Sequence, residues 1–245
     1  MLNIDPVKLN RLKTGCITAW RELRGVLIFV LLMVMFRSAV ADWSDVPTGS
    51  MKPTIIEGDR IFVNKLAYDL RIPLTHISLW RRADPQRGDI IIFDSKALDL
   101  RLVKRVIGLP GDVVEVRRDI VYVNGEALDY SPLAAEGDAA NNAYVRDMVE
   151  SFTSLDDIAE EGKVADDTDH IVRLTRGGYL SDFTATEVPA DSYFVLGDNR
   201  DNSADSRVIG FVPRAEIVGR SSSVVLSLDY EHAWMPRGDR FFHQL

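Results

Sequence analysis

Residues 102–107 read LVKRVI, a short run rich in β-branched side chains that ends at a Gly-Leu-Pro-Gly turn signal. Such a run is typical of a strand. Because side chains alternate between the two faces of a strand, Lys104 shares a face with Leu102 and Val106, and Arg105 lies on the other face. The sequence therefore predicts a strand that carries a lysine in apolar company.

Similar short runs recur along the chain from residue 60 onward, at 60–63, 89–93, 113–116, 120–123, 192–196 and 224–228. The run at 120–123 is followed by Asn124-Gly125, a strong signal for a type I′ hairpin turn. Few segments have helical periodicity. We therefore predict a mainly β fold, with an antiparallel domain over residues 42–245, and 245 residues of 46% hydrophobic composition suffice for its core.

An acidic insertion interrupts this domain at about residues 131–190. Residues 136–170 hold 11 acidic side chains against Arg146 and Lys163. Such a composition is typical of a solvated segment. We expect one short helix in it, near Asp147–Ile158.

The N-terminal part carries a single apolar run of 12 residues, from Gly25 to Phe36. A bilayer takes about 20 residues, so a spanning helix must use Trp20 and Ser38–Ala41 as interfacial ends, with Arg37 reaching toward headgroups. We therefore predict a basic cytoplasmic tail at 1–24 and a single transmembrane helix at 25–41, followed by an extracytoplasmic domain. This topology predicts lipid as a partner and the plasma membrane as the location.

A cleavable signal peptide is the alternative for this region, because residues 39–41 read Ala-Val-Ala after a basic segment and an apolar run. Arg37 and the length of the basic segment argue against it. A mature chain that starts at Asp42 would refute the anchor.

Charge and cysteine content narrow the classes of partner. Residues 1–37 hold six basic and two acidic side chains, a net charge of +4, so −12 lies on the remainder of a chain whose net charge is −8. An acidic main domain argues against nucleic acid as a partner. The single cysteine, Cys16, rules out an intramolecular disulfide.

A candidate nucleophile lies shortly after the apolar run, in the segment PTGSMKPT at 47–54. Ser50 stands between a glycine and a nearby proline, a setting that can fix the direction of its hydroxyl. A serine needs a base to become nucleophilic, and none of the four histidines lies in a motif typical of a Ser-His-Asp site. A lysine is the next candidate because burial can lower its pKa, and Lys52, Lys65 and Lys104 are the options.

Three later segments complete a pattern with this one: GDRIFVNK at 58–65, LVKRVIGLPGD at 102–112 and GDNRDNSADSR at 197–207. In order and character the four segments resemble the boxes of bacterial type I signal peptidase, the membrane-bound leader peptidase. The resemblance covers roughly residues 26–220. It implies a serine endopeptidase that removes signal peptides from exported preproteins and needs no metal or organic cofactor, with the secretion translocase as a possible partner.

The resemblance also assigns roles to residues. It implies that Ser50 is the nucleophile and Lys104 the general base, and that Thr48 and the Ser50 backbone N–H form the oxyanion hole. Ser203 matches the serine that orients the lysine. The supporting ion pair matches Asp205 and Arg207, and the neighbouring 198–200 segment is expected to hold the turn. The family's aromatic pair after the last arginine is replaced here by Val208-Ile209, which leaves the local packing open.

Two other classes of function remain open from the sequence. One is a specialised serine-lysine peptidase, such as a conjugative pilin-maturing enzyme. The other is a non-catalytic, membrane-tethered β domain that binds a partner. A penicillin-binding enzyme is disfavoured because Lys52 has the wrong spacing from Ser50 for S-x-x-K.

Overall fold

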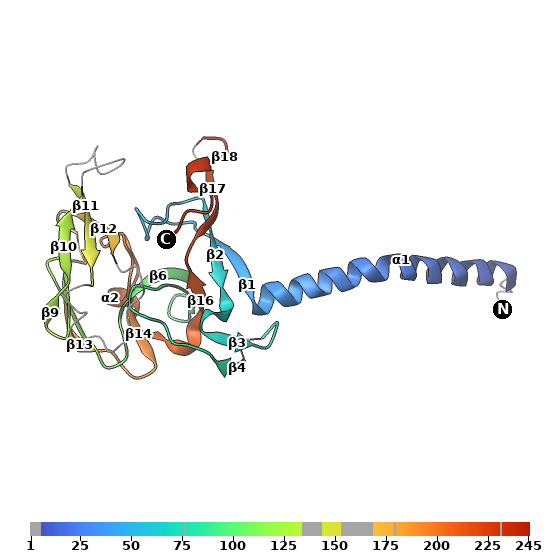
Figure 1. Ribbon diagram of the computed structural model, residues 1–245, viewed down its shortest axis with the longest axis horizontal. Coiled ribbons are helices and arrows are strands. Elements are labelled where there is room, and N and C mark those ends of the chain that lie inside the picture. Colours follow the sequence, from blue (N-terminus) through green and yellow to red (C-terminus); the bar gives the residue numbers. More distant parts are fainter. Residues whose placement is uncertain (1–5, 76, 134–143, 153–168, 179, 231) are drawn as a thin grey trace.

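A long helix precedes a body made of strands (Figure 1). The computed structural model describes residues 6–75, 77–133, 144–152, 169–178, 180–230 and 232–245, with the backbone alone for 6–19 and 21. Helix α1 (Pro6–Ala39) projects away from the body, and every large hydrophobic side chain from Leu23 to Phe36 is exposed. Within the described ranges, no helix carries an apolar stretch long enough to cross a bilayer.

The central sheet of the body has nine strands, in the order β15-β14-β6-β5-β16-β2-β17-β18, with β1 beside β2. All its paired strands are antiparallel, which confirms the predicted mainly β, antiparallel domain. Its strands are β1 (Ala41–Asp45), β2 (Asp59–Asn64), β5 (Ile90–Ser95), β6 (Leu100–Gly108), β14 (Ser192–Leu196), β15 (Val212–Pro213), β16 (Ile217–Ser221), β17 (Val224–Asp229) and β18 (Met235–Pro236).

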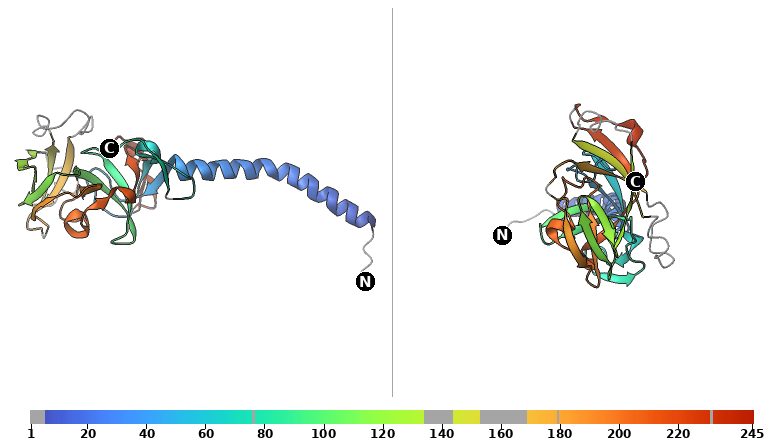
Figure 2. Two further views of the ribbon diagram at one scale, coloured as in Figure 1. Left: turned by 90° about the horizontal axis from the view of Figure 1, so that it is seen from below. Right: turned by 90° about the vertical axis from the view of Figure 1, so that its left-hand side faces the viewer.

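Three smaller antiparallel sheets complete the body, in the orders β13-β7-β8-β9, β10-β11-β12 and β3-β4. The first two lie at the end of the body farthest from α1, as Figure 1 and Figure 2 show. Their strands are β7 (Val113–Arg117), β8 (Ile120–Val123), β9 (Glu126–Ala127), β13 (Phe183–Glu187), β10 (Asp129–Pro132), β11 (Val145–Ser151) and β12 (His170–Thr175), and the third sheet has β3 (Asp69–Arg71) and β4 (Ser78–Arg81).

The seven predicted runs all form strands, namely β2, β5, β6, β7, β8, β14 and β17. The predicted hairpin turn is also confirmed: Asn124 and Gly125 have φ values of 54° and 88°, and Val123 pairs with Glu126 across the turn. Positive φ at both central positions is what a type I′ turn requires.

The expected helix near Asp147–Ile158 is wrong where the structure describes it. Residues up to Ser151 belong to β11, which pairs with β10 on one side and β12 on the other, while 153–158 lie outside the described residues. Asp147 and Glu150 are buried in this strand, each beside an arginine. The acidity suggested a solvated segment because these distant partners are not visible in the local sequence.

Candidate active site

The candidate nucleophile lies in the loop between β1 and β2. Met51 and Ile55 are fully buried in a hydrophobic cluster with side chains of β2, β5 and β16, which anchors the loop on one side. On the other side, the backbone N–H of Asn199 donates to the carbonyl of Ser50 at 3.0 Å, and its side-chain amide donates to the carbonyl of Gly49 at 2.9 Å. The backbone around Ser50 is thus held from two directions.

The amine of Lys104 lies beside this hydroxyl. Lys104 Nζ donates to Ser50 Oγ at 2.8 Å and to the carbonyl of Val103 at 2.9 Å, and the residue is only 2% exposed. Burial lowers the pKa of Lys104 to about 8, although the charges of Asp205 and Asp198 partly oppose this shift. In roughly a tenth of the molecules the Lys104 amine is then neutral at pH 7, and this neutral nitrogen can accept the serine proton.

The predicted surroundings of Lys104 are present. Leu102 and Val106 belong to one hydrophobic cluster, as strand alternation predicted, and β6 pairs Lys104 with the buried Ile91 of β5. The neighbouring Arg105 is also buried, but its guanidinium binds Asp198 through two hydrogen bonds of 3.0 and 2.8 Å. The arginine is therefore fixed as a structural cation, and the lysine is left facing the hydroxyl.

The other two candidate bases are placed differently. Lys52 forms an ion pair with Glu57 at 2.8 Å, and Lys65 forms one with Asp42 at 3.2 Å. Both amines thus face a carboxylate, whereas the amine of Lys104 faces the hydroxyl of Ser50.

The 197–207 segment brings the remaining candidates to the same place. Asp205 is the N-cap of the short helix α2 (Ser206–Ile209). Its carboxylate accepts from the backbone N–H of Gly197 at 3.1 Å and pairs with Arg207 Nη2 at 2.7 Å. Ser203 is buried, and its Oγ has no hydrogen-bond partner among the described residues. A Cβ at Gly197 would lie 2.2 Å from Ser203 Oγ and 2.5 Å from the carbonyl of Ser50, so this glycine allows the two to approach.

Thr48 lies two residues before Ser50 in the same loop and is exposed. It makes no hydrogen bond to a described residue, so its hydroxyl is free for an incoming group. Its role in an oxyanion hole stays a prediction.

Comparison with known proteins identifies the family of this chain. The model of the signal peptidase, peptidase S26 family matches residues 19–226. The chain belongs to this signal peptidase family. It is 34% identical to a signal peptidase I of Pseudomonas fluorescens over 81% of this chain and 69% of the relative, and 32% identical to one of Pseudomonas aeruginosa over 91% and 78%. The chain is therefore a hydrolase of the signal peptidase I type.

A crystal structure of a signal peptidase I from Enterococcus faecalis is 33% identical to this peptidase. The aligned region covers 56% of this chain and 97% of the Enterococcus faecalis chain, with a TM-score of 0.32. That superposition is too loose for a comparison of the two folds.

The sequence did not reveal how strand β12 contributes to the peptidase site. The backbone N–H of Arg173 donates to the carbonyl of Asp198 at 2.8 Å, and the backbone N–H of Arg200 donates to the carbonyl of Arg173 at 3.0 Å. Thr54 Oγ1, after the nucleophile, donates to Asp198 Oδ2 at 2.6 Å. These contacts join the insertion to the segment at residues 197–207, the catalytic turn. No local pattern in residues 170–175 indicates them.

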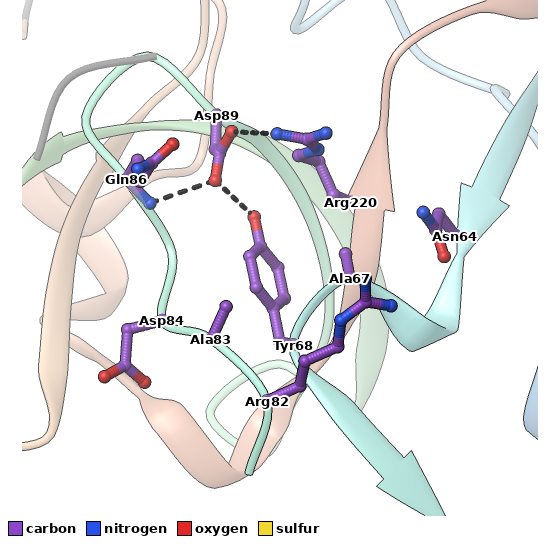
Figure 3. Close-up of a pocket in the computed structure, with 9 residues that line it drawn as sticks. All are labelled: Asn64, Ala67, Tyr68, Arg82, Ala83, Asp84, Gln86, Asp89 and Arg220. Atoms are coloured by element: carbon purple, nitrogen blue, oxygen red, sulfur yellow. Dashed lines mark hydrogen bonds and ion pairs between the residues drawn. The ribbon is translucent and has the colours of Figure 1, made fainter. Parts of the chain in front are cut away.

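A separate pocket of about 270 Å³ is lined by neither Ser50 nor Lys104. Figure 3 shows that Asp89 lies against it and binds Tyr68 Oη at 2.6 Å, the backbone of Gln86 at 2.9 Å and Arg220 at 3.2 Å. Its carboxylate is thus already satisfied by protein groups. In the part of the chain that the structure describes, no three His, Cys, Asp or Glu side chains group as a metal ion would need.

Proposed function

We propose that the chain is a membrane-bound serine endopeptidase that cleaves signal peptides from exported preproteins through a Ser50/Lys104 dyad. The observation that carries this proposal is the 2.8 Å separation of Lys104 Nζ and Ser50 Oγ, with the amine nearly removed from solvent. A buried, readily deprotonated amine in contact with a hydroxyl is the arrangement that serine activation requires.

In the first half of the reaction, neutral Lys104 takes the proton of Ser50 as Oγ attacks the scissile carbonyl. The negative charge that develops on the carbonyl oxygen is stabilised by the backbone N–H of Ser50 and the hydroxyl of Thr48. When the intermediate collapses, the Lys104 ammonium gives its proton to the leaving amine, and the acyl group remains on the serine.

In the second half, neutral Lys104 removes a proton from a water molecule that attacks the ester carbonyl. Collapse of this second intermediate breaks the bond to Ser50 Oγ, which recovers its proton from the ammonium. In this proposal the hydroxyl of Ser203, which makes no hydrogen bond to Lys104 in this structure, orients the amine during the reaction. Asp205 with Arg207 holds the turn that carries Ser203.

The test uses detergent-extracted protein and a labelled preprotein. Ser50→Ala and Lys104→Ala should each leave the preprotein at full length, with a loss of at least about 1,000-fold in kcat because each removes a member of the reacting pair. Lys65→Ala is the matched control, since it removes another of the three candidate lysines, one that follows β2 and pairs with Asp42. Processing by either dyad variant at the normal rate would end the proposal. A pilin precursor tested in parallel distinguishes the specialised class of peptidase.

We also propose that α1 anchors the chain in the inner membrane, with its basic end in the cytoplasm. Its side chains from Val26 to Phe36 are exposed and apolar, which is costly in water and favourable in lipid. Ala41, where a signal peptide would be cut, lies in β1 and pairs with Asn64. N-terminal sequencing of the membrane-extracted protein should find residues before Asp42.

A further inference from the structure

A fully buried carboxylate lies in the insertion, on the middle strand of the β10-β11-β12 sheet. Glu150 is 0% exposed and receives a hydrogen bond from Tyr130 Oη of β10. His170 of β12 lies 3.1 Å from its Oε1. Burial alone would raise the pKa of Glu150, but Arg200 and His170 outweigh burial and lower it, so the group is an anion.

The cation that neutralises this anion comes from the catalytic turn. Arg200 is 2% exposed, and its Nη2 donates to Glu150 Oε1 at 2.5 Å. Its Nε and Nη1 have no hydrogen-bond partner among the described residues, where Glu150 is its one ion-pair partner. The position of this buried guanidinium therefore depends on one carboxylate.

Arg200 directly follows the residue that holds the nucleophile. Asn199 donates to the carbonyls of both Gly49 and Ser50, and Asn199 in turn lies between the two residues that bond to Arg173 of β12. A displacement of the arginine thus reaches the Ser50 backbone through a single intervening residue.

We propose that Glu150 is a positioning residue of the peptidase, which acts through Arg200 and Asn199 to fix the Ser50 backbone against Lys104. The inference rests on the proposed dyad and gives the acidic insertion a role in catalysis. Glu150 itself touches neither the nucleophile nor the base. Because acyl transfer depends on alignment, a small displacement of Ser50 should lower kcat and leave substrate binding almost unchanged.

A matched control lies on the same strand. Asp147 is also buried and binds the guanidinium of Arg173 with hydrogen bonds of 2.8 and 2.7 Å. The bonds of Arg173 to residues 198 and 200 come from its backbone instead, and Asp147→Asn leaves those backbone groups in place. Glu150→Gln and Asp147→Asn therefore each remove one charge from a buried ion pair of β11. A merely structural role predicts similar effects of the two substitutions on both stability and activity.

The experiment measures kcat and KM of the full-length protein on a signal-sequence peptide, well below the melting temperature. The concentration of active enzyme is determined by active-site titration. Glu150→Gln should lower kcat by at least about tenfold with KM within about threefold, whereas Asp147→Asn should leave kcat within about twofold. Glu150→Asp keeps the charge and should recover part of the loss. If Glu150→Gln does not fold, Glu150→Asp takes its place in every comparison. The expected kcat loss is then smaller, because the shorter side chain keeps the charge but weakens the contact with Arg200.

A double-mutant cycle then tests the route through Asn199. If Glu150 acts through this residue, Glu150→Gln combined with Asn199→Ala should lose no more kcat than Asn199→Ala alone, whereas Asp147→Asn with Asn199→Ala should show independent effects. Equal kcat losses for Glu150→Gln and Asp147→Asn, or effects that multiply for Glu150→Gln and Asn199→Ala, would overturn the inference. An active Ser50→Ala protein would instead overturn the dyad, so the two failures are distinguishable.

Discussion

Two adjacent cations of β6, Lys104 and Arg105, are both nearly removed from solvent, at 2% and 5% exposure. They differ in their partners. The arginine is neutralised by Asp198, whereas Lys104 has no carboxylate within ion-pair distance among the described residues. A buried ammonium with no carboxylate in contact is stabilised only by the more distant charges of Asp205 and Asp198, so burial lowers its pKa. The choice of general base thus follows from one buried aspartate.

The pKa of Lys104 predicts how activity depends on pH. Because only the neutral amine can accept the serine proton, kcat/KM should rise with pH and reach half its maximum near pH 8. A Lys104→Arg variant should be inactive at every pH, because a guanidinium does not lose its proton. The measurement is a kcat/KM profile from pH 6 to 10. A kcat/KM that still rises steeply up to pH 10, as for a lysine of ordinary pKa, or a flat profile, would contradict the assignment.

Ser203 offers a test of orientation with little effect on folding. Its Oγ is buried without a partner among the described residues, so Ser203→Ala should change the free energy of unfolding by less than about 1 kcal/mol. Peptide kcat should nevertheless fall by about tenfold or more, because the amine loses an orienting group. Ser221→Ala is the control, since Ser221 Oγ in β16 is also buried and has no hydrogen-bond partner in the described part of the chain. Equal kcat for the two variants would remove Ser203 from the site.

At the scale of elements, the site forms where three segments of the chain meet. β6 carries Lys104, the proposed base, and the loop between β1 and β2 carries Ser50, the proposed nucleophile. The end of β14 leads into the turn beside both. Gly197 follows β14 directly, and the carbonyl of Ser50 and the hydroxyl of Ser203 occupy the space where its side chain would lie. The close approach of these segments therefore requires glycine at this position.

A Gly197→Ala substitution should accordingly affect both stability and activity. The added Cβ would overlap two groups of the site, so we expect a loss of about 1–3 kcal/mol in unfolding free energy and a large fall in kcat. Gly238→Ala is the control, because a Cβ there meets nothing within 4 Å. Denaturant unfolding and the peptide assay measure the two effects. Normal activity of Gly197→Ala would show that this contact is not needed.

At the scale of the whole molecule, α1 and the body are joined at a narrow junction. The helix meets the body near β1, where Lys65 Nζ donates to the carbonyl of Arg37 at 3.0 Å and Ser38 Oγ accepts from the backbone of Leu74 at 2.6 Å. Arg37 binds Asp42 at 2.7 Å, a contact that the sequence did not indicate when it suggested headgroups as its partner.

This junction predicts that the body folds without the rest of the helix. A chain that begins at Ser38 should move from the membrane fraction to the supernatant and keep its unfolding free energy within about 1 kcal/mol, because α1 contributes little to the core. Its kcat/KM on a soluble peptide should equal that of the full chain. A truncated protein that stays with the membrane would count against α1 as the anchor.

The sequence by itself determined the antiparallel strands, the hairpin at Asn124-Gly125 and the family, because these depend on local periodicity and on short motifs. It also limited the general base to a few lysines. Only the tertiary structure decided that Lys104 faces Ser50, 54 residues earlier in the chain, and that Glu150 lies buried against Arg200. Burial and ion pairing join residues that are distant in sequence, so no local pattern could have established them.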